Sequence, residues 1–204
     1  MFDVNIYLNV AELIGPPFTW QKLQASAATL ASEPVPHEDP RCDSLRAIAA
    51  CSTGRFAGKH PLHVWTGAHI DALVRFKAQQ PCDPALYPED RGLGWSADDA
   101  QTLVDELVWG VVRRSTGGSV GDIFPDGNPP LSHEDGVVYG TAKQSADGDV
   151  VCERYCVTHD RDFLSADLPS YPRRLTAATF VALVRAARAK IATQAYLQNR
   201  QPPR

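Results

Sequence analysis

Residues 150–158, which read VVCERYCVT, decide the fold class of this chain. Val151 and Val157 occupy one parity of the segment, and Cys152 and Cys156 occupy the other as small apolar residues. Because successive side chains of a strand point to opposite faces, apolar residues on both parities predict a strand that is buried on both faces. Strands of this kind are typical of parallel sheets that are covered by helices.

The rest of the chain alternates between strand-like and helix-like patterns. Strands are predicted at 2–10, where the strand runs into a helix or turn, at 62–65 and at 150–158, and helices at 20–30, 43–51, 66–78, 96–115, 134–144 and from 176 onward. This alternation predicts an α/β fold with a mainly parallel sheet. We expect a single domain over residues 1–190, elaborated by loops near 31–61 and 79–132, followed by a loose C-terminal tail at 191–204.

The composition is that of an ordinary globular domain. Of the 204 residues, 44% are hydrophobic and 22% are charged, which is enough apolar surface for a core. No run of ~18 apolar residues indicates a membrane span, and the start of the chain lacks the pattern of a secretory signal. The five cysteines include no C-x-x-C pair, which argues against a disulfide scaffold or a zinc site and suggests free thiols in the cytoplasm.

The formal net charge of −4 argues against a broad basic surface for nucleic acid. It does not exclude a nuclease, because a cluster of metal-binding carboxylates adds negative charge that bound cations offset.

Acidic residues stand at three points where a site is expected. Asp3 and Asn5 follow the first residues of the chain, and the segment 157–163, VTHDRDF, leaves the late strand. Asp135 opens the helix at 134–144. Open α/β sheets build their sites at the carboxyl ends of parallel strands, although aspartate is also a common helix cap and turn residue. Asp3 is the exception, because it interrupts an apolar strand, where an ionised carboxylate needs a cation or donors.

These motifs together resemble those of the PIN-domain nucleases, in particular the VapC-like toxins of bacterial type II toxin–antitoxin systems. The resemblance covers roughly residues 1–190. It matches an opening Asp-x-Asn, a third acid followed by apolar residues and alanine, and a final Thr-x-Asp with a following Asp-Phe; the matching residues are Asp3, Asn5, Asp135 to Ala142, Thr158, Asp160, Asp162 and Phe163. It implies a PIN-like three-layer α/β/α fold with helical elaboration.

The second acid of the family is the point at which the chain departs from the pattern. The segment 64–71, VWTGAHID, resembles the family's second strand and following helix, and the register places the acid at Ala72. Asp71 is the adjacent acid and is our first candidate, and Glu106 is the fallback.

The resemblance implies a ribonuclease that uses Mg²⁺ or Mn²⁺. All-oxygen ligands favour such hard cations, which lower the pKa of a bound water and neutralise charge on the scissile phosphate. The expected catalytic acids are Asp3, Asp71, Asp135 and Asp160, with Asp3, Asp135 and Asp160 on the metal. Asp162 is expected to orient waters, and Asn5 and Thr158 to brace the carboxylates.

The implied substrate is RNA in a single-stranded or loop region. Arg161, Arg173 and Arg174 are candidates for phosphate contacts, although surface arginines without a role fit equally well. The resemblance also implies a small antitoxin partner, for which the apolar stripes at 103–112 and 180–183 are candidate grooves, and it is compatible with a homodimer. Both stripes fit an ordinary core better, because each helix of an α/β domain needs one apolar face.

Four alternatives remain open at this stage. One is a housekeeping RNA-processing nuclease, and another is a PIN-like binding protein without activity. A phosphatase of the haloacid-dehalogenase kind needs Asp-x-Asp, where this chain has Asn5 in the place of the general acid. A histidine-based metal hydrolase is suggested by the neighbouring residues 133–135, HED, and 159–160, HD.

Overall fold

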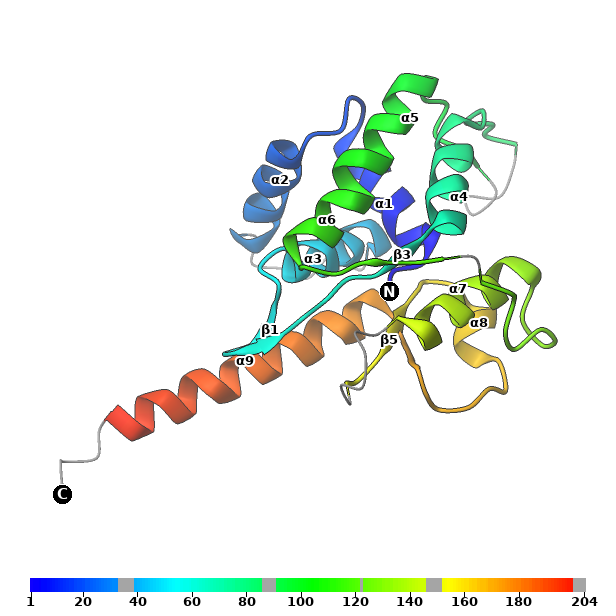
Figure 1. Cartoon of the computed structure of the whole chain (residues 1–204). Coiled ribbons are helices and arrows are strands. Elements are labelled where there is room, and N and C mark those ends of the chain that lie inside the picture. The colour runs from blue at the N-terminus through cyan, green and yellow to red at the C-terminus, as the bar shows by residue number, and fades with distance from the viewer. Residues whose placement is uncertain (33–38, 86–90, 122, 146–151, 200–204) are drawn as a thin grey trace.

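The computed structural model of the chain describes residues 1–32, 39–85, 91–121, 123–145 and 152–199 (Figure 1). The helices are α1 (Val4–Ile14), α2 (Trp20–Ser32), α3 (Pro40–Cys51), α4 (Ala68–Gln79), α5 (Ala97–Leu103), the π-helix η2 (Val104–Val108), α6 (Trp109–Arg114), α7 (His133–Gln144), α8 (Arg161–Ser165) and α9 (Ala177–Asn199). The strands are β1 (Arg55–Ala57), β2 (His60–Pro61), β3 (Thr66–Gly67), β4 (Ser119–Val120), β5 (Tyr155–Val157) and β6 (Arg173–Leu175).

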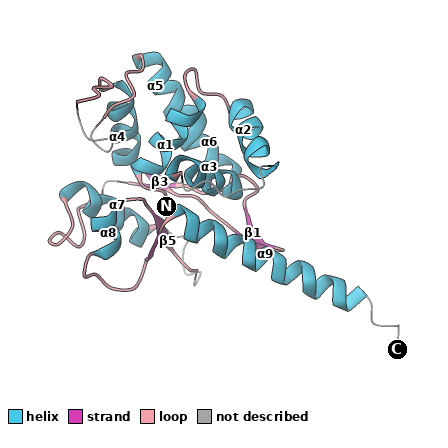
Figure 2. Cartoon of the chain, turned by 180° about the vertical axis from the view of Figure 1, so that it is seen from behind, coloured by secondary structure: helices cyan, strands magenta, loops and turns pink. Residues whose placement is uncertain are grey.

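The strands are short, and most of their pairs are parallel. β3 pairs with β4 and β5 pairs with β6 in parallel, and Phe2 forms a parallel bridge with Val157. β1 and β2 form a separate antiparallel pair. In both views the first residues lie between β3 and β5, with helices α1–α6 on one side of the strands and α7 and α8 on the other (Figures 1 and 2). The mixed α/β class predicted from the sequence is therefore confirmed.

The prediction of a strand over residues 2–10 is wrong beyond its first residue. Phe2 forms a β-bridge and Asp3 is extended, and α1 begins at Val4, whose backbone N–H donates to the Asp3 carboxylate at 2.6 Å. The apolar residues that follow have helical spacing, and their side chains pack into the core: Ile6, Tyr7, Val10 and Ala11. The helical spacing of the apolar residues therefore determined the structure of this segment, in spite of its β-branched composition.

Most of the predicted helices are confirmed in place. The helix expected at 96–115 is a continuous amphipathic helical segment made up of α5, η2 and α6. Its apolar residues from Leu103 to Val112 are buried in the core. The strand expected at 62–65 is displaced to β3, directly before α4.

The five thiols are free, as expected, but Cys152 is exposed, so its predicted burial beside Cys156 is wrong. The start of that segment, residues 150 and 151, lies outside the described residues.

The C-terminal segment also differs from the prediction. Residues 191–199 continue α9, where a loose tail was expected, and residues 200–204 lie outside the described part of the chain. The end of α9 extends beyond the rest of the fold in both views (Figures 1 and 2). Within the described residues, no helix combines the length and apolar character needed to cross a membrane.

Candidate functional site

Asp3 is the most deeply buried acid of the site, with 5% of its surface exposed. It lies between the parallel bridge at Phe2 and the start of α1, so the backbone fixes its position. One carboxylate oxygen accepts the N–H of Val4 at 2.6 Å. The other accepts the side-chain amide of Asn5 and the hydroxyl of Thr158, each at 2.6 Å. These donors allow a carboxylate to remain in a largely apolar surrounding.

Asn5 and Thr158 connect the start of the chain to the end of β5. The Asn5 amide also donates to the Thr158 hydroxyl at 3.0 Å, and its carbonyl accepts the His159 N–H at 3.1 Å. The Thr158 hydroxyl in turn accepts the Asp160 N–H at 2.9 Å. This network holds two acids, Asp3 and Asp160, at a fixed separation. The bracing role expected for Asn5 and Thr158 therefore has a direct structural counterpart at Asp3.

Asp135 and Asp160 each stand at the start of a helix. One oxygen of Asp160 accepts the Phe163 N–H at 2.9 Å and caps α8. One oxygen of Asp135 accepts the Ser132 hydroxyl at 2.7 Å, and the oxygen of Ser132, the N-cap of α7, accepts the Asp135 N–H at 3.1 Å. In both aspartates the second carboxylate oxygen accepts no hydrogen bond from the described residues.

The electrostatics show that these acids lie close together. Burial raises the pKa of Asp3 to about 6, hydrogen bonds from Thr158 and Val4 oppose the shift, and the negative charges of Asp135 and Asp160 add to it. Burial likewise raises the pKa of Asp135; the Ser132 hydrogen bond opposes this, and the charges of Asp160, Glu134 and Asp162 increase it. Acids from residues 3, 135 and 160–162 thus form one electrostatic cluster, which we call the acid cluster and define as Asp3, Asp135, Asp160 and Asp162.

No salt bridge among the described residues joins a basic side chain to this cluster. The ion pairs within the described residues involve other acids, namely Glu12, Asp39, Asp43 and Asp126. Carboxylates that repel one another and lack a basic partner favour a bound cation. Among the residues that the structure describes, no group of three or more acidic, histidine or cysteine side chains is arranged so that it could hold a metal ion. The oxygen donors of the cluster are of the kind that a hard cation such as Mg²⁺ prefers, and such an ion usually keeps several waters and takes only one or two carboxylates directly.

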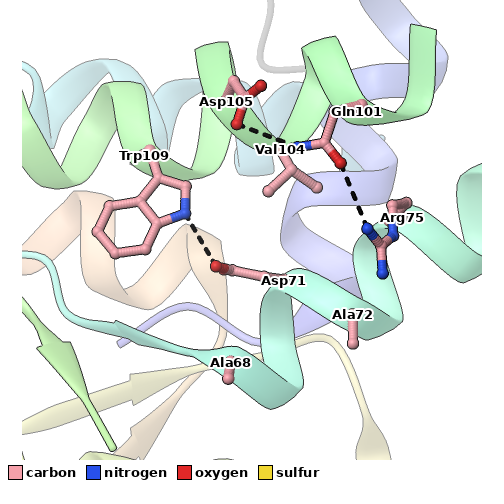
Figure 3. Close-up of a pocket in the computed structure, with 8 residues that line it drawn as sticks. All are labelled: Ala68, Asp71, Ala72, Arg75, Gln101, Val104, Asp105 and Trp109. Atoms are coloured by element: carbon pink, nitrogen blue, oxygen red, sulfur yellow. Dashed lines mark hydrogen bonds between the residues drawn. The ribbon is translucent and has the colours of Figure 1, made fainter. Parts of the chain in front are cut away.

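Asp71 has a different set of neighbours (Figure 3). Its two carboxylate oxygens accept the Trp109 indole N–H at 2.8 Å and the Thr66 hydroxyl at 3.2 Å. Burial raises the pKa of Asp71, the Trp109 and Thr66 hydrogen bonds oppose the shift, and its charged neighbours are Asp105 and Arg75. The acid cluster contributes none of these contacts.

The hollow beside Asp71 has a volume of about 250 Å³ and lies between α4 and the π-helical region. A chain of side-chain hydrogen bonds crosses it, from Arg75 to Gln101 at 3.4 Å and from Gln101 to Asp105 at 3.1 Å (Figure 3). Ala72, the position that the family register assigns to the second acid, lines the same hollow. Glu106, the fallback, is exposed on η2.

The three candidate arginines have distinct surroundings. Arg174 donates to the carbonyls of Phe163 and Ala166 at 3.0 and 2.7 Å, so it supports α8. Arg173 lies over the Tyr155 ring, 5.8 Å from its centre. Arg161 is exposed at the first position of α8, beside the cluster in sequence. Arg161 and Arg173 are both exposed and therefore accessible to a phosphate.

Two contacts of the site were not anticipated from the sequence. His159 bonds through Nε2 to the Ser44 hydroxyl at 2.9 Å, which ties the segment after β5 to α3. Trp109, which belongs to an apolar stripe, supplies a donor to Asp71. A half-buried indole N–H usually requires an acceptor, and that requirement was the available signal for the second contact.

Comparison with known proteins gives no family assignment. No family model matches the chain, and no curated protein or solved structure shows significant similarity to it.

Proposed function

We propose that this chain is a metal-dependent endoribonuclease of the PIN type, with its active site at the acid cluster. The observation that supports this proposal is the convergence of Asp3, Asp135 and Asp160, from three distant points of the chain, on a region without a basic partner. The motif resemblance supplies the identity of the substrate, and the parallel strands and flanking helices are compatible with a PIN-like three-layer arrangement.

The protein's part in the reaction follows from the contacts of the acids. Asp3, Asp135 and Asp160 would hold Mg²⁺ or Mn²⁺ directly or through water. Asp135 and Asp160 each keep one carboxylate oxygen that accepts no hydrogen bond from the described residues, whereas both oxygens of Asp3 already accept hydrogen bonds. The bound ion supplies an activated water and stabilises charge on the scissile phosphate. Asn5 and Thr158 hold the Asp3 carboxylate in place, and Asp162, which is exposed beside Asp160, orients water at the edge of the cluster. In this proposal Asp71 supports α4 and α6 through its bonds to Thr66 and Trp109.

The phosphatase alternative finds less support in the contacts of Asn5. That chemistry requires a general acid two residues after the nucleophilic aspartate. Asn5 occupies the position, and both ends of its amide are engaged, in donation to Asp3 and Thr158 and in acceptance from His159. The side chain is therefore a fixed brace with no acidic proton to transfer.

The test of the proposed function is cleavage of single-stranded RNA by the purified chain. We expect cleavage with Mg²⁺ or Mn²⁺, complete loss in EDTA, and recovery when excess metal is returned. Asp160→Asn should abolish cleavage, while the retained side-chain oxygen still accepts the Phe163 N–H and keeps α8 capped. Cleavage that persists in chelator would overturn the mechanism. Absence of Mn²⁺ binding in calorimetry would instead favour a PIN-like binding protein without activity.

The toxin role and the antitoxin partner rest on the resemblance alone. If the chain is a toxin, its expression slows bacterial growth and co-expression of the adjacent small gene relieves the effect. Harmless expression together with metal-dependent RNA cleavage in vitro would favour a housekeeping RNA-processing nuclease.

A further inference from the structure

A second open hollow lies on the other side of the α4 start, between α4, the segment after β4 and α7. Its volume is about 360 Å³, within the ~300–1,000 Å³ typical of small-ligand sites. We call it the histidine hollow, and the residues that matter here are His69, His133, Ile123, Val137 and Thr141. Its wall thus combines apolar surface with imidazole groups, and none of its residues belongs to the acid cluster.

Glu134 connects the histidine hollow to the acid cluster electrostatically. Burial lowers the pKa of His69, and the charge of Glu134 opposes that shift. The charge of Glu134 also adds to the raised pKa of Asp135. His133 of the hollow and Asp135 of the cluster both belong to the first turn of α7, so the two features are adjacent on this helix.

The side chains that line the hollow favour an uncharged ligand. His69 is neutral at pH 7 because burial lowers its pKa, and its Nε2 is a buried atom without a hydrogen-bond partner. A neutral imidazole has one donor and one acceptor, which suit the edge of a polar heterocycle. The described residues that line the hollow include no Lys or Arg, so a phosphate would find no cation there. A nucleobase satisfies these conditions better than the RNA backbone does.

An exposed aromatic residue directly follows one of the residues that line this hollow. Phe124 is 90% exposed and directly follows Ile123, which lines the wall. The segment is anchored on α7, because the Asp126 N–H donates to the Gly136 carbonyl at 2.9 Å and Asp126 forms an ion pair with Lys143 at 2.5 Å. At Gly140 a Cβ would lie 2.7 Å from the Ile123 side chain, so the glycine permits this close packing. Phe124 is therefore presented to solvent by a fixed backbone.

We propose that Phe124 and the histidine hollow together bind an unstacked nucleobase of the strand that the acid cluster cleaves. Single-stranded nucleic acids are recognised by stacking of bases on aromatic rings and by hydrogen bonds to base edges. Phe124 provides the stacking surface, and His69 provides the hydrogen-bonding group. The position of the strand in this proposal rests on the proposed function, whereas the base site itself can be tested without catalysis.

The experiment measures binding of a fluorescent single-stranded oligonucleotide at low salt in EDTA, where no cleavage occurs. RNA and DNA of the same sequence form two arms, because an unstacked base can come from either. Phe124→Ala should weaken binding about five- to a hundredfold, the range for losing one stacked base. His69→Ala should weaken it by a smaller factor. The matched control is Tyr196→Ala, an aromatic ring that is 55% exposed on the C-terminal part of α9. Thermal melts verify that each variant is folded.

The outcomes separate this proposal from the proposed function. Binding by Phe124→Ala within twofold of the unmodified chain overturns the base site, whether or not RNA is cleaved. Equal weakening by Tyr196→Ala, absence of binding by the unmodified chain, or an equal loss with double-stranded RNA, whose bases are stacked, also overturns it. Loss of binding in Phe124→Ala without metal-dependent cleavage by any form overturns the nuclease and leaves the base site standing. As a second measurement, photocrosslinks from 4-thiouridine RNA should map to the segment 123–125 or to His69.

Discussion

Helices α5 and α7 begin with the same local structure but in different surroundings. In α5 the Ser96 hydroxyl donates to Asp99 at 2.7 Å and accepts the Asp99 N–H at 3.1 Å. In α7 the same two bonds join Ser132 and Asp135 at the same distances. The charge of Asp135 contributes to the raised pKa of Asp3, and the charge of Asp160 contributes to the raised pKa of Asp135. Asp99 is not among the residues that contribute to either shift. Both aspartates bond to the serine that caps their helix, and the difference between them lies in what the fold brings next to α7.

This pair shows why a capping motif is ambiguous evidence for a site. The sequence predicts Asp135 as a helix cap or as a metal ligand, but the N-cap of α7 is Ser132, and one carboxylate oxygen of Asp135 accepts the Ser132 hydroxyl. That contact leaves the other carboxylate oxygen available, so support of the cap and metal binding are compatible in a single side chain. Asp99 therefore provides a natural control, since it has the cap without the cluster.

The largest expected difference between Asp135 and Asp99 is in catalysis. Asp135→Asn should abolish metal-dependent RNA cleavage and weaken Mn²⁺ binding more than about a hundredfold, since even indirect supports of metal ligands typically contribute 10–100-fold. Asp99→Asn removes the same capping contact and should leave both quantities near those of the unmodified chain. Initial cleavage rates and calorimetry measure the contrast. Equal loss of activity in both variants would mean that α7 matters as a helix and that Asp135 is not a ligand.

The next effect concerns the pH dependence of stability in the metal-free protein. Asp3 has a pKa of about 6 when folded and an ordinary value of 3.8 when unfolded, so the folded chain retains a proton that the unfolded chain has lost between these pH values. The Asp3 contribution to the free energy of unfolding therefore falls as pH rises from about 4 to 6, by roughly 3 kcal/mol in total.

Asp3→Asn removes this titration, and that makes the effect measurable. The difference in unfolding free energy between the variant and the unmodified chain, from urea titrations at pH 4, 5, 6 and 7, should shift in favour of the variant as pH rises. Added Mg²⁺ should reduce the shift, because a bound cation stabilises the ionised Asp3. A difference that does not vary with pH would show that burial does not perturb Asp3.

The smallest effect concerns Asp71, the acid that the structure surrounds with donors. Trp109→Phe removes the indole N–H and leaves one half-buried carboxylate oxygen without its partner, which should lower the free energy of unfolding by about 1–2 kcal/mol. Mn²⁺ binding should remain unchanged. Glu106→Ala, an exposed position on the neighbouring η2, is the control and should change stability by less than about 0.5 kcal/mol. A loss of Mn²⁺ binding in Asp71→Ala would return Asp71 to the metal site.

The sequence was sufficient where local patterns are decisive. The periodicities of α4, α6 and α9 predicted helices that the structure contains. Parity in the segment before Thr158 predicted the buried parallel strand β5. The segment after Asp3 was misread because its β-branched residues favoured a strand, while the cap at Asp3 and the burial of one face produced a helix.

By itself, the sequence determined which acids stand at the ends of strands and the starts of helices, since caps and strand ends depend on neighbours a few residues away. Only the tertiary structure decided which of those acids meet. It placed Asp3, Asp135 and Asp160 in one electrostatic cluster and paired Asp71 with Trp109, which is 38 residues distant in the chain. The physical reason is that repulsion and desolvation act through space, and the separations that govern them are fixed by the packing of the strands and helices.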